Sequence, residues 1–202
     1  MSDTNKIKYG IKNVYYAVAT EATNGTLTFG TPVAMPGAVN LTLDPEGTDA
    51  AQFYADNIVY YLAPGSNNGY TGSIELAKVP DSFRTDVLGD IADSNGLLVE
   101  NAEAESKHFA LLFEFAGDKM STRHAIYNCT AARPSVASAT KEEQVEPQTE
   151  TVNLTAIPMK YLTAGTTPTE YQLVKAKANG TDSATQYNAW FTTVQVPTIT
   201  GA

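Results

Sequence analysis

The sequence predicts a mainly β protein: a two-sheet antiparallel β-sandwich or open barrel with one short flanking α-helix. Its composition is the first reason. Charged residues make up only 17% of the 202 residues, and Thr, Asn, Ala and Tyr are abundant instead. Such a composition suits strands and turns better than the surfaces of long helices. The second reason is a series of short alternating apolar runs, separated by turn residues about every ten positions.

Four segments at the start of the chain follow this pattern. Alternation over 7–22 predicts a first strand or strand pair. The Gly- and Pro-rich segment 23–37 predicts turns, and clean alternation over 38–44 predicts another strand. The polar segment 45–50 predicts a turn after it.

The stretch 52–62 predicts a strand of an unusual kind, because both of its faces would be apolar and only Asp56 and Asn57 interrupt them. Its aromatic residues are Phe53, Tyr54, Tyr60 and Tyr61. A surface strand of a monomer is normally apolar on one face only. We therefore expect the second face to be covered either by the chain's own core or by another molecule. A loop is expected over 63–72 and a strand over 73–79.

The best helix signal covers 80–90. Asp81 or Ser82 can cap its first turn, and Gly89 is placed to end it. Its apolar residues share one face and would flank a sheet: Phe83, Val87 and Leu88.

The stretch 95–118 begins with a turn and ends in the strongest strand signal of the chain. Alternate residues of that strand give it one continuous aromatic and aliphatic face: Phe109, Leu111, Phe113 and Phe115. The segment 123–134 is its expected hairpin partner. A polar linker over 135–148 and a strand over 149–161, stopped or edged by Pro158, follow.

The last forty residues show weaker alternation and a final apolar run over 187–197. We expect an appended hairpin or arm there, which packs on the same domain or extends from it. The chain is accordingly divided into a β-sandwich domain over 1–160 and a C-terminal arm or hairpin over 161–202.

Few residues point to chemistry. His108 and His124 are expected to be cross-strand neighbours near Glu114, but their spacing matches no metal motif, so ordinary strand histidines are the favoured interpretation. The single cysteine, Cys129, lies in an alternating run and is expected to be a small buried hydrophobe. The sequence contains no phosphate-binding loop, nucleophile elbow or zinc-protease motif. We therefore expect no enzymatic activity, no metal and no cofactor.

Charge and hydropathy limit the partners. The net charge is −9, and residues 44–105 hold 12 acidic but only two basic residues. A basic patch of the kind that nucleic-acid readers use is not found in this stretch. The acidic stretch is either a solvated surface or a surface that lies near a polyanion without binding it. No signal-peptide core or apolar run of about 20 residues is present, so we expect a chain kept in a cytosol or released by lysis, with no membrane partner.

Several segments, in this order along the chain, resemble the phi-thirteen type of major tail protein, the tail-tube protein of long-tailed, siphovirus-like bacteriophages. They occupy residues 32–61, 68–89, 107–115, 127–135 and 147–158. The resemblance covers roughly residues 5 to 160.

This resemblance implies a fold similar to that of type VI secretion tube proteins, with two packed β-sheets and a flanking helix. It implies a virion protein, assembled in the host cytoplasm, that forms stacked six-membered rings around a channel. Its partners would be other copies of itself and the tape-measure, baseplate and tail-terminator proteins. DNA would pass through the channel without specific binding.

The same resemblance gives roles to the aromatic and acidic residues. The expected subunit-interface residues are Phe53, Tyr54, Tyr60, Tyr61 and Tyr70. The candidates for an acidic channel lining are Asp44, Glu46, Asp49 and Asp56. The turn-rich segments 23–37 and 63–72 are candidates for contacts between rings. The alternative function is a monomeric β-sandwich binding module that recognises carbohydrate or protein through exposed tyrosines.

Overall fold

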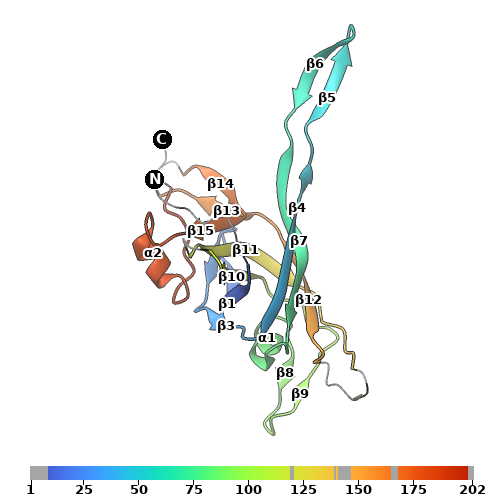
Figure 1. Cartoon of the computed structure of the whole chain (residues 1–202), viewed down its shortest axis with the longest axis vertical. Coiled ribbons are helices and arrows are strands. Elements are labelled where there is room, and N and C mark those ends of the chain that lie inside the picture. Colours follow the sequence, from blue (N-terminus) through green and yellow to red (C-terminus); the bar gives the residue numbers. More distant parts are fainter. Residues whose placement is uncertain (1–8, 119–120, 139, 141–146, 165–167, 200–202) are drawn as a thin grey trace.

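The computed structural model of the chain describes residues 9–118, 121–138, 140, 147–164 and 168–199. These residues form mostly antiparallel strands and two short helices (Figure 1). The elements are β1 (Ile11–Glu21), β2 (Leu27–Phe29), β3 (Val33–Ala34), β4 (Ala38–Thr48), β5 (Ala51–Ala55), β6 (Ile58–Ala63), β7 (Ser66–Leu76), α1 (Asp81–Asp86), β8 (Ile91–Ala92), β9 (Leu98–Val99), β10 (Phe109–Phe115), β11 (Arg123–Ala131), β12 (Glu150–Ala156), β13 (Met159–Leu162), β14 (Glu170–Leu173), β15 (Lys175–Ala178) and α2 (Ala184–Ala189).

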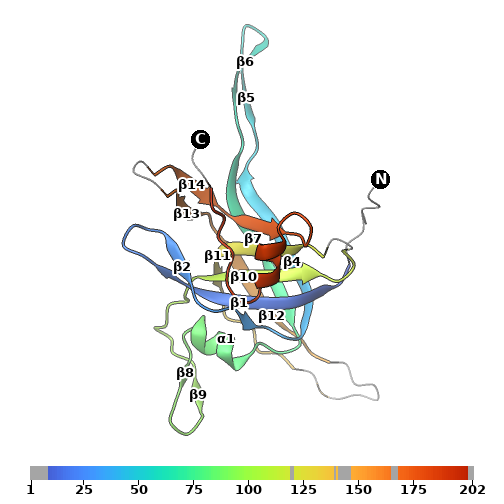
Figure 2. The same cartoon turned by 90° about the vertical axis from the view of Figure 1, so that its left-hand side faces the viewer.

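One large sheet organises the fold, with the strand order β2-β1-β10-β11-β12-β7-β4. Strand β3 is added to β1, and β15 is added to β11. All of these pairs are antiparallel. Because β4, at one end of the order, also contacts β1, the sheet curls on itself (Figure 2). The expected class, mainly β with a β-sandwich or open barrel and a flanking helix, is confirmed, and a second short helix, α2, was not expected.

Strand β10 is buried on both faces. Phe109, Leu111 and Phe113 point into the curled sheet and form an inner core with residues of β1, β7, β12 and α1. Ala110 and Leu112 point the other way, into an outer core formed with β1, β11 and the C-terminal part of the chain. The two-residue period of the strand thus feeds two separate cores.

Helix α1 flanks the inner core, and its predicted apolar residues Phe83, Val87 and Leu88 are all buried. Its start differs from the prediction. Pro80 is the N-cap residue, and no side chain makes a capping hydrogen bond. Gly89 has a φ of +79° just after the helix, a left-handed conformation that favours glycine, so the predicted ending is confirmed.

The C-terminal residues cover the outer face of the sheet (Figure 1). Strands β13 and β14 pair as a hairpin, and β15 pairs with β11. The expected apolar run over 187–197 is not extended: it contains the end of α2 and the buried Trp190, whose Nε1–H donates to the His124 carbonyl at 3.2 Å. The division of the chain at residue 160 stays a prediction, although the outer core contains residues from both sides of it.

Three expected irregular segments contain strands, and the first is the turn-rich segment 23–37, which includes β2 and β3. Residues 45–48 continue β4, and residues 66–72 belong to β7, so the predicted turn and loop are wrong there. The two strands pair as one long ribbon, with a bulge between Glu46 and Gly47. Glycine in this ribbon allows the backbones of the two strands to approach closely and does not mark a turn. A Cβ on Gly72 would lie 1.9 Å from the Thr42 carbonyl oxygen.

The other expectations have simple outcomes. Strand β1 is present but has a bulge between Lys12 and Tyr15, which turns Ile11 toward the inner core. The β10–β11 hairpin and a strand ending before Pro158 are confirmed. The expected linker 135–148 lies partly outside the described residues, and its described part contains no helix or strand.

We predict a large difference between two substitutions of the same chemistry. Phe109 is fully buried in the inner core, and Phe53 is exposed. Phe109→Ala should lower the free energy of unfolding by about 3–5 kcal/mol through lost burial and an unfilled cavity. Phe53→Ala should change it by no more than about 0.5 kcal/mol. Urea unfolding of the monomeric variants measures both, and equal losses would contradict this assignment of the core.

Candidate functional site

The stretch 52–62 is a hairpin and not the single strand that its pattern predicted. Strands β5 and β6 pair, with Ala55 opposite Ile58, and Asp56 and Asn57 form the two-residue turn between them. The φ angles of these two residues are 51° and 62°, the left-handed conformation that two-residue hairpin turns require. Asp and Asn tolerate this conformation better than most residues, and that was the missed signal.

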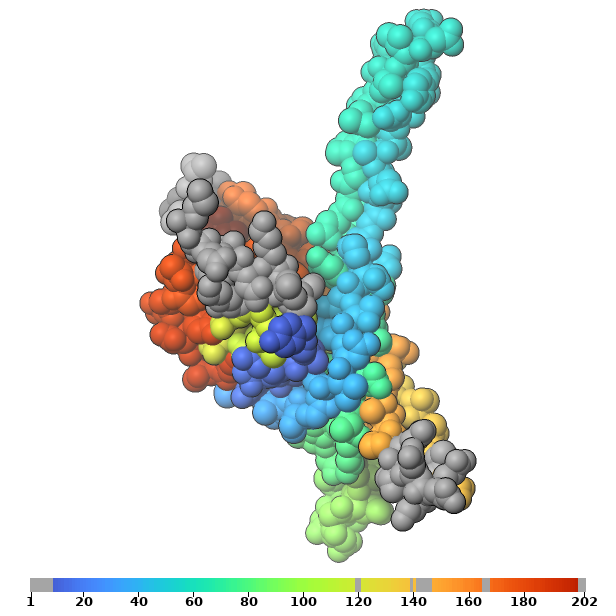
Figure 3. Space-filling view, viewed as in Figure 1, coloured from blue at the N-terminus to red at the C-terminus, as the bar shows by residue number. Residues whose placement is uncertain are grey.

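This hairpin projects from the body of the molecule as a narrow arm at the end of the β4–β7 ribbon (Figures 1 and 3). Its aromatic side chains are 60% to 72% exposed: Phe53, Tyr54, Tyr60 and Tyr61. The possibility that they form the chain's own core is therefore wrong. Tyr70, the fifth expected interface residue, lies apart from them on β7 and packs partly buried against the inner core.

Both faces of the hairpin are apolar. Phe53 pairs with Tyr61 across the strands, so these two rings share one face. Tyr54 pairs with Val59, and Leu62 lies opposite Gln52. An isolated two-stranded hairpin is at best marginally stable in water, and an exposed apolar patch marks an interaction site. The hairpin is therefore a candidate contact surface.

A second surface is the polar face of strands β4, β7 and β12. Their alternate residues Leu41, Ile74 and Val152 point into the inner core. The intervening residues lie side by side across the three strands on the opposite face: Asn40, Glu75 and Thr151; Thr42, Ser73 and Asn153; Asp44, Thr71 and Thr155. These are hydroxyl, amide and carboxylate groups, and the three strands contain no Lys or Arg.

The acidic channel candidates fall into two places. Asp44 and Glu46 belong to β4 and are exposed, and Glu46 accepts a hydrogen bond from Thr71 Oγ1 at 2.8 Å. Asp49 and Asp56 belong instead to the base and the turn of the projecting hairpin. Sequence reasoning missed Glu75, because only the strand register places it on the polar face.

The histidines are not the cross-strand neighbours that were expected. His124 lies opposite Phe113, and its ring stacks on that ring with centroids 5.3 Å apart. His108 is just outside β10, and its Nδ1 is hydrogen-bonded to Asn128 Oδ1 at 2.6 Å. Within the described part of the chain, no group of three His, Cys, Asp or Glu side chains is arranged to hold a metal ion.

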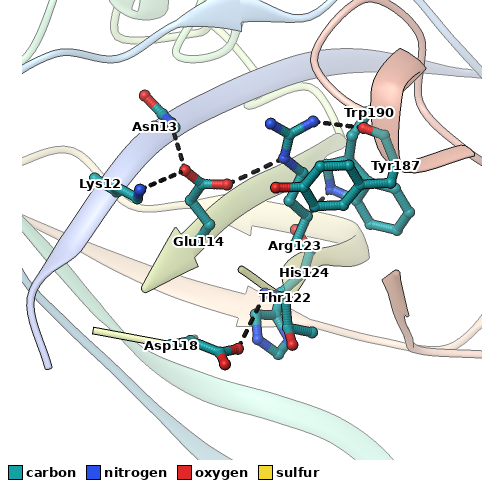
Figure 4. Close-up of polar contacts among 9 residues, drawn as sticks. All are labelled: Lys12, Asn13, Glu114, Asp118, Thr122, Arg123, His124, Tyr187 and Trp190. Carbon is teal, nitrogen blue, oxygen red and sulfur yellow. Dashed lines mark hydrogen bonds and ion pairs between the residues drawn. The ribbon is translucent and has the colours of Figure 1, made fainter. Parts of the chain in front are cut away.

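Glu114 has a structural role at the outer core (Figure 4). It is only 3% exposed and accepts bonds from Asn13 Nδ2 at 2.6 Å and Arg123 Nε at 3.0 Å, with Lys12 Nζ at 3.1 Å. The Arg123 guanidinium lies over the Tyr187 ring, 3.8 Å from its centroid, and donates to the Tyr187 carbonyl. This chain of contacts fastens the C-terminal residues to the sheet.

Cys129 is buried in the inner core, as expected. Burial raises the pKa of its thiol to about 12, so the thiol is neutral at physiological pH. No helix in the described parts of the chain has the length and apolar character needed to cross a membrane.

Comparison with known proteins gives one family. The family model described as phage tail tube protein matches residues 2–200. No curated protein matches the chain. The family match includes both the projecting hairpin and the polar sheet face.

We predict that Glu114→Gln will lower the free energy of unfolding by about 3 kcal/mol. The change leaves Arg123 partly buried without its opposing charge. Trp190 is the only tryptophan, so its fluorescence during urea unfolding reports on the C-terminal residues. The control is Asp81→Asn, since the exposed Asp81–Lys78 pair should contribute no more than about 1 kcal/mol. Equal effects of the two substitutions would refute the role of Glu114.

Proposed function

The chain belongs to the phage tail tube protein family, and from this premise we propose that its copies join into rings that stack into a tube for DNA delivery. In this proposal the protein is a structural component of the virion tail and has no catalytic role. The rings would have six members, and the tube ends would contact the tape-measure, baseplate and tail-terminator proteins. The hairpin with two exposed apolar faces is the observation that carries the proposal.

The hairpin would supply a subunit interface. Its side chains Phe53, Tyr54, Tyr60 and Tyr61 are exposed in the single chain, and packing against another copy would remove them from water. Aromatic residues are enriched at such interfaces because they bury a large area at little entropic cost. Strand β4 also ends the large sheet, so ring closure would cover an exposed sheet edge.

The polar face of β4, β7 and β12 would line the channel. DNA carries one negative charge per about 1.7 Å of helix, and proteins that bind it release counterions by presenting Lys or Arg. This face presents Asp44, Glu46 and Glu75 among hydroxyl and amide groups, with no cation on its strands. Such a lining would let DNA slide past without being held. Asp49 and Asp56 would face the neighbouring copy instead.

The binding-module alternative fits less well. It also uses exposed tyrosines, but it requires them to line a concave patch. Here Tyr54, Tyr60 and Tyr61 are carried by a narrow projecting hairpin (Figure 3). The family match also favours the tube.

We predict that Phe53→Asp and Tyr60→Asp will give folded monomers that no longer polymerise. Each change places a charge in an apolar interface, while the side chains lie outside the cores. Electron microscopy and sedimentation measure tube formation, and urea unfolding checks the fold. Tyr60→Phe is the matched control and should polymerise. Normal tubes from both Asp variants would contradict the interface.

We also predict that reversing the charge of the polar face slows DNA ejection. A variant with Asp44→Lys, Glu46→Lys and Glu75→Lys would place cations along the DNA path. The drag on DNA should then diminish as salt rises. The control variant carries the same charge change on exposed residues elsewhere: Asp81→Lys, Glu103→Lys and Glu105→Lys. The ejection rate is measured as the release of DNA from virions with variant tails. Identical rates for the two variants would contradict the proposal that this face lines the channel.

A further inference from the structure

We propose that an open hollow between the β4–β7 ribbon and β15 receives the projecting hairpin of a second copy, with Asp56 at the hairpin turn paired to Lys175 and Lys177. The inference rests on the proposed self-assembly and adds the surface that receives the hairpin. It commits to a second copy of the chain as the occupant.

The hollow exists because the large sheet divides at this point. Strand β11 pairs with β15 over Arg123–Ile126, but with β12 only over Cys129–Ala131. Strand β7 pairs with β12 only from Tyr70 to Leu76. Its preceding residues, 66–69, pair with β4 alone. The space between β7 and β15 is therefore not bridged by backbone hydrogen bonds. A hollow of about 490 Å³ opens there, within the size range of ligand pockets.

The lining of the hollow is apolar at its base and cationic at its rim. Leu43, Phe113 and Phe115 line it from β4 and β10, together with Tyr70 from β7. The exposed side chains of Lys175 and Lys177 come from β15, and the Lys175 ammonium lies 5.8 Å from the centroid of the Tyr70 ring.

Two further titratable groups line the hollow, Asp118 and His124. A carboxylate oxygen of Asp118 accepts a hydrogen bond from the Thr122 backbone N–H at 3.0 Å (Figure 4). The described charged residues that line the hollow are thus two lysines and one aspartate, on a chain whose net charge is −9.

The hairpin has the complementary properties. Residues 45–65 contain Glu46, Asp49 and Asp56 and no Lys or Arg. Tyr60, the most exposed of its aromatic side chains, lies three residues after the turn. An aromatic ring next to a carboxylate suits an apolar base with a lysine rim, because the ring is buried while the charges pair.

The chain's own hairpin cannot be the occupant, because it points away from the body of the molecule (Figures 1 and 2). Another exposed apolar hairpin, β8–β9, is a poorer receiving surface for an acidic tip. Its exposed Ile91, Leu97 and Val99 are flanked by Asp93 and Glu100. A contact between a hairpin on one copy and a hollow on the next joins different surfaces, so it continues from copy to copy instead of closing a pair.

A charge exchange tests the pairing. Asp56→Lys alone, or Lys175→Asp with Lys177→Asp, places like charges together and should raise the protein concentration needed for tube formation about tenfold or more. Combining all three changes restores opposite charges and should return this concentration toward that of the unaltered chain. Asp49→Lys, the same charge change at the base of the hairpin, is the control and should have a smaller effect. Unaltered assembly by the separate variants, or no recovery in the combined variant, overturns the pairing.

A photocrosslink tests the location independently. The full chain, with a benzophenone amino acid in place of Tyr60, is assembled and irradiated, and mass spectrometry locates the joined peptides. Crosslinks to peptides containing Phe113–Phe115 or Lys175–Lys177 of another copy are expected. Tubes whose crosslinks lie only elsewhere, such as on β8–β9, overturn the hollow and leave the tube proposal standing. An unaltered chain that forms no tubes under any condition, alone or with the other tail proteins, counts against both.

Discussion

A strand that is apolar on both faces must be covered on both faces, and the structure depends on how this requirement is met. Strand β10 meets it within the chain: the curled sheet and α1 cover one face, and the C-terminal residues cover the other. The Glu114–Arg123 contacts hold that second cover in place. The β5–β6 hairpin has the same apolar character, but the described residues of its own chain leave its aromatic side chains exposed. The requirement that folds the body is therefore not met at this hairpin by the described residues of a single copy.

The strands β4, β7 and β12 obey the opposite rule, with one apolar face and one polar face. Their inner faces complete the core, so their polar faces are left in contact with solvent. Since β4 and β7 also continue into the projecting hairpin, one ribbon carries both the uncharged or acidic surface and the apolar arm. The position of one surface is thus tied to that of the other through a continuous backbone ladder. In the proposed tube, this connection would place the lining and the intersubunit contact on the same pair of strands.

Sequence pattern predicted the parts whose signals are local. The alternation through Phe109–Phe115, the apolar face of α1 and the stop at Pro158 depend on neighbouring residues, and each was found. The extension of β4 and β7 was missed, because Gly and Asn are typical of turns and only pairing between distant segments makes these residues strands. The aromatic residues of the hairpin could be identified from the sequence alone. Which of them share a face could be known only once the turn was placed at Asp56–Asn57. The position of Glu75 on the polar face could be known only from the register of three strands, which no local sequence pattern contains.

The acidic residues of the hairpin also address a problem that its apolar faces create. A free copy with an exposed two-stranded apolar arm risks pairing with any exposed strand edge. Asp56 at the turn and Asp49 at the base oppose such contacts, because burying an unpaired carboxylate is costly and because like charges on identical arms repel. A surface that offers cations beside an apolar base removes this penalty, and the hollow with Lys175 and Lys177 is such a surface. The same charge can therefore keep free copies apart and select the one ordered contact in which it is paired.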